Sequence, residues 1–510
     1  MTVRRSIFWA FSGQIASAAI AFGSSVIIAR LLTPYEFGLN AIAVATSGIL
    51  SVIATSGADA FIIREVKLTR QVIATATTVN TILFSFLSLT LLGVSFAAKP
   101  LLGDANAGVV VRILAVLPLL NIFTFRPAAM LQRQMRFKAA ALVALAAVTV
   151  NNGVTIASIL LGASYVGPAI GAVSGVVTTL IFYAFINPTD LRPSFSLSGI
   201  RVMALFGLRM MSVSGSGQIV QYASQIILGR LLGVEALGIY SRATLLANFI
   251  FSQFYGTATR VVFSHMSKVN RETGDIKETF VRSLYTINSI IWPLLLNLVF
   301  LSGPAMRILY GGQWGEAAKP FSILMLTQIA WLTFGMHWEL FVIRDKLKIQ
   351  ARYEIARSVI GLILFSIGCM FSMPAAAAGR LVEALIGSVL YFPWLPRLSG
   401  ARYSEILAIY LRAGLIAVAT AVPSLALMML TGWNPAVPLA PLLGAIALGT
   451  VIWVGGLLVV SHPLLSESRM LWALGRRSVP SPLSRLLQIG RSDAAAAPQV
   501  GDDPPTGERF

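Results

Sequence analysis

The chain has 510 residues, of which 56% are apolar and 12% charged, and its 39 Lys and Arg against 20 Asp and Glu give a net charge of +19. A charged fraction about half that of an ordinary soluble domain excludes a soluble globular protein. The apolar residues form continuous blocks of about twenty, the length of a helix that crosses a ~30 Å hydrocarbon core. We therefore predict an all-α integral membrane protein and not a barrel, whose strands would alternate in period two.

The residue types that carry catalysis or bind metals are scarce. The single cysteine, Cys369, lies inside an apolar block and is interpreted as a small buried side chain. The three histidines are far apart in sequence: His265, His337 and His462. The sequence also lacks a G-x-x-x-x-G-K-[ST] phosphate loop. We therefore predict no enzyme, no catalytic residue, no metal site, no cofactor and no nucleic-acid partner.

About fourteen membrane-spanning helices are predicted in chain order. The first follows Arg4 and Arg5, and we interpret it as an uncleaved span because its apolar run continues to Ala29. In the twelfth, Arg380 and Glu383 are three residues apart and can pair on one helix face, so we interpret them as structural. The predicted spans are residues 7–29, 37–63, 72–97, 109–125, 139–162, 164–186, 201–229, 237–258, 282–303, 319–341, 355–373, 374–395, 407–430 and 437–460.

The distribution of Lys and Arg predicts that both termini are cytoplasmic. With the N-terminus inside, most of the 39 basic residues fall in the cytoplasmic segments, as the positive-inside rule requires. Only five fall in the outer loops: Arg30, Lys99, Arg230, Arg307 and Lys319. The expected location is a bacterial inner membrane.

An internal repeat relates the two halves of the chain. Residues 24–39 align without a gap on residues 224–239, an offset of 200. The matching residues are Arg30, Leu31, Leu32 and Gly38 with Arg230, Leu231, Leu232 and Gly238. Six helices, an even number, separate the copies, so both halves enter the membrane in the same sense. We expect two pseudo-symmetric lobes around a central cavity, related by an axis along the membrane normal.

This repeat suggests four parts of the chain. We expect an N-terminal lobe at 1–200 with spans one to six and a C-terminal lobe at 201–395 with spans seven to twelve. Residues 396–460 add two further spans. The tail, 461–510, has many Arg and Pro residues and is expected to be cytoplasmic, basic and partly disordered.

Three stretches of sequence resemble one known family. They are Ala29–Leu39 (ARLLTPYEFGL), Gly57–Glu65 (GADAFIIRE) and Arg126–Lys138 (RPAAMLQRQMRFK). They are similar to the polysaccharide transporter family of O-antigen-type flippases, in the multidrug/oligosaccharidyl-lipid/polysaccharide exporter superfamily. The resemblance covers residues 1 to about 460 and implies a V-shaped pair of lobes, with spans one, two, seven and eight lining the cavity.

The resemblance also implies a function. The implied cargo is an oligosaccharide on undecaprenyl pyrophosphate, carried to the outer leaflet for exopolysaccharide or lipopolysaccharide synthesis. Membrane lipids are expected partners, and a polysaccharide polymerase and export components are candidates. Two alternatives are an ion-coupled drug exporter of the same superfamily and a membrane-embedded sugar polymerase, although the longest predicted outer loop, 304–318, is short for a polymerase.

Arg209 is the first candidate for binding this cargo. It lies about eight residues into the seventh span, ~12 Å from its start, and a lone intramembrane Arg costs at least ~2.5 kcal/mol. Its guanidinium suits the pyrophosphate or an acidic sugar, or it reaches the headgroups by snorkelling. Ser212 and Ser216 follow on the same helix face.

Further candidates lie on spans two, seven and eight. A polar stripe of Gln218, Gln221 and Gln225 suits either sugar hydroxyls or hydrogen bonds between helices. Arg242, near the outer end of the eighth span, is a second anion contact or another snorkelling side chain. Asp59 is expected either to counter one of these arginines or to bind a coupling cation.

Overall fold

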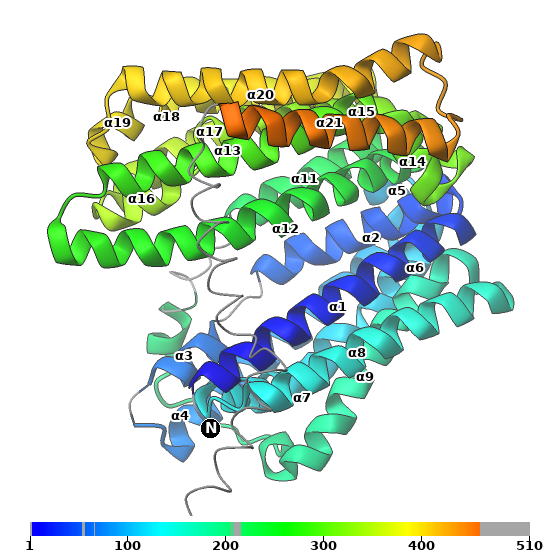
Figure 1. Cartoon of the computed structure of the whole chain (residues 1–510). Helices are drawn as coiled ribbons and strands as arrows, with labels where there is room; N and C mark the ends of the chain where they lie inside the picture. The colour runs from blue at the N-terminus through cyan, green and yellow to red at the C-terminus, as the bar shows by residue number, and fades with distance from the viewer. Residues whose placement is uncertain (1–2, 54–56, 66, 206, 208–215, 460–510) are drawn as a thin grey trace, which may run out of the picture. The chain divides into compact units, whose positions relative to one another are not determined.

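The computed structural model describes residues 3–53, 57–65, 67–205, 207 and 216–459, and these ranges are helical apart from their connections (Figure 1). The chain divides into two compact units, residues 1–452 and 453–510. Only residues 453–459 of the second unit are described, so the predicted tail at 461–510 lies outside the described residues. The paragraphs below concern the first unit.

The described helices follow the predicted spans. In the first half they are α1 (Val3–Leu31), α2 (Pro34–Ile53), α3 (Ala58–Arg64), α4 (Arg70–Phe96), α5 (Ala98–Leu102), α6 (Asn106–Leu114), α7 (Val116–Arg133), α8 (Phe137–Ser158), η1 (Ile159–Ala163), η2 (Ser164–Val166), α9 (Gly167–Ile186) and η3 (Pro188–Leu191). In the second half they are α11 (Ser216–Leu231), α12 (Val234–Thr273), α13 (Lys277–Phe300), α14 (Ser302–Tyr310), η4 (Gly312–Ala317), α15 (Ala318–Leu332), α16 (His337–Ile343), α17 (Leu347–Cys369), α18 (Met373–Tyr391), α19 (Trp394–Ser399), α20 (Tyr403–Leu430) and α21 (Leu439–Val459). Fourteen of the described helices have 15 or more residues, so the predicted multi-pass helical bundle is confirmed.

Nine described segments are long and apolar enough to cross a membrane, and they include ten of these fourteen helices. Two of the other four helices are short, with 16 residues in α11 and 15 in α15. The remaining two, α12 and α17, carry several charged residues. All four line the largest cavity described below. The charged residues of α12 and α17 are what a position beside a polar cavity allows.

Three predicted spans are interrupted in the structure. The second becomes α2 and α3, with Gly57 in the left-handed region (φ 60°) just before α3. The fourth divides at Ala115 into α6 and α7, and the tenth into α15 and α16, where Met336 has φ 63°. The eighth is longer than predicted: α12 has 40 residues, about 60 Å. The part of α12 beyond the predicted span is polar. Hydropathy does not detect it, because a helix can extend beyond the membrane without a continuous run of apolar residues.

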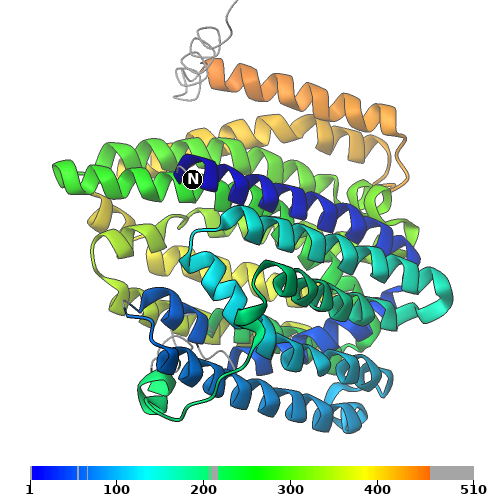
Figure 2. The same cartoon turned by 90° about the horizontal axis from the view of Figure 1, so that it is seen from below.

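The two halves use the same helix pairs. The hairpin of α8 and α9 corresponds to that of α17 and α18, and the packing of α4 on α7 corresponds to that of α13 on α15. Likewise α1 packs along α8, as α11 does along α17 (Figures 1 and 2). The additional helix α20 packs on α13. These matched pairs are the two pseudo-symmetric lobes that the repeat predicted.

The lobes meet where α2 crosses α12. A Cβ atom on Gly38 would lie 1.9 Å from the carbonyl oxygen of Val234, and one on Gly238 would lie 1.9 Å from that of Pro34. The matched glycines of the repeat therefore allow the same close backbone approach from both sides, as expected about a pseudo-two-fold axis.

The matched arginines also contact the opposite lobe. Arg30 donates to the carbonyl oxygens of Ile308 (2.6 Å) and Leu309 (3.2 Å) at the end of α14. Arg230 lies beside Gly103, at the end of α5, with its Nη1 3.7 Å from where a Cβ would be. Both turns of the repeat therefore lie at the same end of the bundle, which we call the Arg30 end.

Candidate functional site

The largest described cavity has a volume of about 780 Å³ and is lined by both lobes. This volume is within the range of small-molecule sites in proteins. From the N-terminal lobe, α2 and α9 contribute mainly small apolar side chains, including Ala41, Val44, Ala169 and Ala172. From the C-terminal lobe, α11, α12, α15, α17 and α18 contribute amides, hydroxyls and charges. The cavity therefore has one mainly apolar wall, on which Asn40 is polar, and one mainly polar wall.

Four charged residues form a chain of ion pairs on the polar wall. Arg357 Nη1 lies 2.6 Å from Glu383 Oε1, and its Nη2 lies 2.5 Å from Glu354 Oε1. Arg380 Nη1 lies 2.8 Å from Glu383 Oε2. The predicted pair of Arg380 and Glu383 is thus present, as part of a longer chain.

This chain of ion pairs joins three helices of the lobe. Arg380 also donates to the hydroxyl of Ser224 on α11 (2.5 Å), and the Tyr391 hydroxyl on α18 donates to Glu354 (3.2 Å). The chain contains two positive and two negative side chains, so it is neutral as a whole. Because these side chains are partly buried, loss of one partner would leave a charge uncompensated.

The predicted glutamine stripe is partly on this wall. Gln221 and Gln225 line the cavity, whereas Gln218 is exposed on α11 and is not among its lining residues. Ser216 is the first residue of α11, but its side chain is not described, and Arg209 and Ser212 lie outside the described residues. The lining also includes α2 and α12, while α1 contributes no lining residue from its described side chains. Most of α1 instead packs along α8.

Arg242 is buried at the Arg30 end and is only 1% exposed. Its guanidinium carbon lies 4.0 Å from the ring centre of Phe37, 4.7 Å from that of Tyr310 and 5.3 Å from that of Trp314. Its Nε and Nη2 have no hydrogen-bond partner among the described residues, and Nη1 reaches the carbonyl oxygen of Ser25 at 3.4 Å. Aromatic faces therefore replace a carboxylate as its partners.

Two neighbours of Arg242 define its surroundings further. Phe37 lines the large cavity as well as covering the guanidinium, so this ring lies at the boundary between them. Burial raises the pKa of the Tyr310 hydroxyl above its usual range, and the charge of Arg242 opposes that shift. The Tyr310 ring is therefore neutral beside the guanidinium at physiological pH.

Asp59 lies at a different cavity, of about 400 Å³, within the N-terminal lobe. This cavity is lined by α2, α3, α4, α6 and α7, with further polar contributions from Ser47, Asn80, Asn121 and Gln132. Arg242 is enclosed by other residues, so the structure gives Asp59 and Arg242 separate surroundings.

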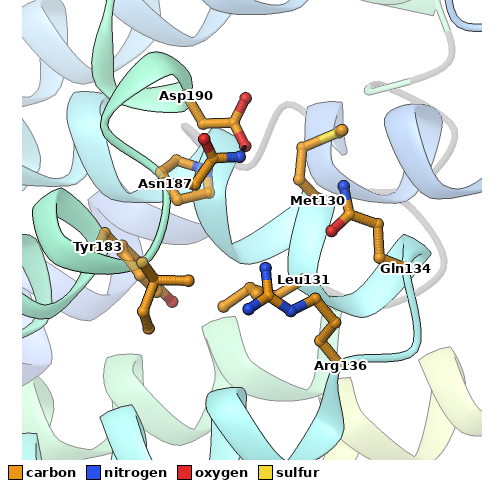
Figure 3. Close-up of a pocket in the computed structure, with 9 residues that line it drawn as sticks. Met130, Leu131, Gln134, Arg136, Tyr183, Asn187 and Asp190 are labelled. Carbon is orange, nitrogen blue, oxygen red and sulfur yellow. Dashed lines mark hydrogen bonds between the residues drawn. The ribbon is translucent and has the colours of Figure 1, made fainter. Parts of the chain in front are cut away.

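A third hollow lies between α7, α9 and η3 and is shown in Figure 3. Its volume of about 10 Å³ holds at most one water molecule, so it cannot receive a substrate. Asn187 donates to Asp190 across one side of it (2.6 Å), and Asp190 also pairs with Arg126 (3.1 Å). These contacts join the end of α9 to α7.

Glu354 and Arg357 are cavity residues that the sequence did not single out. Both lie in α17, three residues apart, the same spacing that predicted the pair of Arg380 and Glu383. That spacing was the available signal. Their contact with α18 could not be read from it, because it depends on how α17 and α18 pack.

The comparison with protein families agrees with this architecture. The model of a family described as "Polysaccharide biosynthesis protein" matches residues 27–319, more than half of the chain. The chain belongs to this family. The match includes all three stretches that carried the resemblance, and it extends across both turns of the repeat.

Among characterised relatives, the succinoglycan biosynthesis transport protein ExoT of Rhizobium meliloti is 24% identical over 341 residues. That alignment covers 64% of this chain and 66%, just under two thirds, of ExoT. The lipopolysaccharide biosynthesis protein WzxC of Escherichia coli is 21% identical over 409 residues, covering 79% of this chain and 83% of WzxC. These two relatives are named for the synthesis of two different polysaccharides, succinoglycan and lipopolysaccharide.

Solved structures with the same fold include a flippase and a drug transporter. The lipid II flippase MurJ, in an inward closed conformation, has a TM-score of 0.70 at 16% identity and covers 90% of this chain and 100% of its own. An inward-facing multidrug transporter of the MATE family has a TM-score of 0.53 at 18% identity and covers 78% of this chain and 96% of its own. At these identities the likeness establishes the fold alone.

Proposed function

We propose that this chain moves an undecaprenyl-pyrophosphate-linked oligosaccharide from the inner to the outer leaflet of the bacterial inner membrane. The observation that carries this proposal is the 780 Å³ cavity between two lobes, with one mainly apolar and one mainly polar wall. An amphiphilic cargo needs both kinds of surface, since its isoprenoid chain avoids water and its sugars require hydrogen bonds. Membership of the polysaccharide biosynthesis family supports the same cargo.

The contacts at the Arg30 end suggest how such a transporter is held closed on one side. Arg30 caps the last carbonyl groups of α14, and the side chains of Gln313 and Trp314 each donate to the carbonyl oxygen of Ala29 in the last turn of α1 (2.8 Å each). Each helix end thus satisfies free carbonyl groups of the other lobe. With both termini cytoplasmic, as the basic residues predict, these contacts close the outer side.

The alternative of an exporter for cationic drugs fits this cavity less well. Its two lining carboxylates, Glu354 and Glu383, are both paired with arginine. A bound organic cation would have to compete with these guanidinium groups or leave them uncompensated. A lipid-linked sugar faces no such competition, because hydroxyl groups can bond to an intact ion pair.

Deleting the gene in its own bacterium separates these alternatives. We expect lipid-linked oligosaccharide to accumulate on the cytoplasmic leaflet, measured in membrane extracts and by its accessibility in inverted vesicles. Unchanged lipid intermediates together with greater sensitivity to drugs would instead identify a drug exporter. Re-expression of the chain should clear the accumulated lipid.

A further inference from the structure

Four amide side chains on the C-terminal lobe face the large cavity without a protein partner. They are Gln221, Gln225, Asn248 and Gln328, from α11, α12 and α15. Among the described residues none of these amides makes a hydrogen bond to protein. Each amide can donate two hydrogen bonds and accept two. Within a membrane such groups are costly unless water or a ligand satisfies them.

The ion-pair chain beside these amides can also bond to a ligand without adding net charge. Arg380 has five N–H groups, of which the contacts to Glu383 and Ser224 use two. Glu383 receives one guanidinium on each oxygen, which leaves further lone pairs. A neutral wall with many donors and acceptors suits hydroxyl groups. It suits pyrophosphate poorly, because the anion would have to displace the carboxylates from their arginines.

The facing wall from the N-terminal lobe offers few polar groups. Its side chains are mainly apolar, such as Ala41 and Ala172. The amide nitrogen of Asn40, which also lies on this wall, already donates to the carbonyl oxygens of Glu36 and Tyr165. Most polar side chains that line the cavity therefore come from the C-terminal lobe.

From this placement we infer that the polar wall of the C-terminal lobe, formed by the four amides and the ion-pair chain, is the subsite for the sugars. It binds an uncharged, hydroxyl-rich oligosaccharide, and the pyrophosphate and isoprenoid bind elsewhere. This inference rests on the proposed function, because it divides the proposed cargo between two regions of the protein.

Binding to the purified full-length chain in lipid nanodiscs tests the inference with two probes. One is the lipid-linked oligosaccharide extracted from cells that lack the transporter, and the other is undecaprenyl pyrophosphate without sugars. In the double variant Gln221→Leu/Gln328→Leu, we expect roughly tenfold weaker binding of the first probe, since several neutral hydrogen bonds are lost. Binding of the second probe should stay within twofold. Gln225→Leu alone should show a smaller loss of the same kind.

The control is Gln253→Leu, the same substitution on an exposed position of α12 that does not line the cavity. It should leave both affinities unchanged, and the thermal stability of every variant is measured in parallel. Suppose that the wild type binds the lipid-linked oligosaccharide. Equal losses of affinity for the two probes in the double variant, or no loss for either probe, would then overturn the sugar subsite. Failure of the wild type to prefer either probe over phosphatidylglycerol would overturn the proposed function itself, and the subsite with it.

Discussion

Arg242 illustrates what can and cannot be predicted about one residue from the sequence. The sequence left Arg242 as either an anion contact or a side chain that snorkels to the headgroups, and the structure buries it with 1% exposed. Its partners could not be predicted, because Phe37, Tyr310 and Trp314 come from three distant segments. Periodicity assigns a residue to a helix face, but it does not say which rings another lobe places against that face.

Replacement of Arg242 distinguishes a transport role from a packing role. Arg242→Met keeps an unbranched stem and removes a buried charge that has no carboxylate partner within the described part of the chain. We expect unchanged or slightly higher thermal stability, because apolar replacement of a buried charge is often neutral or stabilising, together with a loss of transport. A large drop in stability with normal transport per folded molecule would assign Arg242 to packing alone.

Arg209, the first candidate for binding the cargo, lies outside the described residues. Removing a guanidinium that holds an anion should cost about 1.5 to 3 kcal/mol of binding. Arg209→Ala should therefore weaken transport by at least tenfold at matched membrane levels. Arg209→Lys keeps the charge without the planar fork, so its partial activity would indicate a point charge and its inactivity a bidentate contact.

Arg412→Ala provides the control for this comparison. Arg412 lies within α20 and is exposed, where we predict only snorkelling. It should retain normal transport. If Arg209→Ala inserts normally and transports like the wild type, Arg209 does not bind the cargo, and Arg242 becomes the better candidate.

At the scale of elements, the stretch Ala29–Leu39 is a joint between helices. The Tyr35 hydroxyl donates to Asp104 (2.6 Å), and Glu36 accepts from the backbone of Thr33 (2.8 Å) and from the Ser164 hydroxyl. The residues that carried the family resemblance here are therefore structural contacts around the start of α2. They indicate the fold more directly than the substrate.

The third family stretch, Arg126–Lys138, also makes structural contacts between helices. It includes the C-terminal end of α7. Arg133 donates to the carbonyl oxygens of Ile62 and Glu65 at the end of α3 (2.6 Å each). Hydropathy predicted α3 as the continuation of the second span. Its separation depends on the left-handed Gly57 and on this arginine, and neither contact has a signal in the apolar pattern.

From the close crossing of α2 and α12 we predict that a larger side chain at Gly38 lowers thermal stability. In Gly38→Ala the new Cβ would lie 1.9 Å from the carbonyl oxygen of Val234, so the two backbones must separate. Overpacking of this kind costs about 1 to 3 kcal/mol, and we expect a lower melting temperature of the purified protein. Gly23→Ala on α1, where a Cβ meets nothing within 4 Å, should be neutral or slightly stabilising. Equal stability of the two variants would contradict the described crossing.

At the scale of the whole molecule, the sequence predicted the number of long helices and the parallel repeat, because both follow from spacing. It did not predict that the polar cavity wall belongs to one lobe. The repeat alignment covers 16 positions near one turn, whereas Gln328, Glu354 and Arg380 of the polar wall lie on three later helices. Divergence between the copies therefore produces the asymmetry on which the proposed sugar subsite depends.

The orientation of the chain is a prediction about the whole molecule that reporter fusions can test. Fusions at Thr69, Lys138, Thr273 and Lys346 should report the cytoplasm, because basic residues gather in these segments. Fusions at Asp104 and Gly312 should report the outer side. A cytoplasmic signal at Asp104 would contradict the orientation and would place the Arg30 end inside.

Translocation by the purified chain tests the central claim most directly. Proteoliposomes would contain the lipid-linked oligosaccharide extracted from cells that lack the transporter, and periodate, which does not cross the bilayer, would oxidise only the sugars exposed outside. We predict that wild-type protein brings the inner-leaflet pool within reach of the oxidant. Vesicles with Arg412→Ala should give the same result as the wild type. In vesicles with Arg209→Ala the inner-leaflet pool should stay protected from the oxidant. Protection of the inner pool in wild-type vesicles, equal to that in protein-free vesicles, would contradict the account.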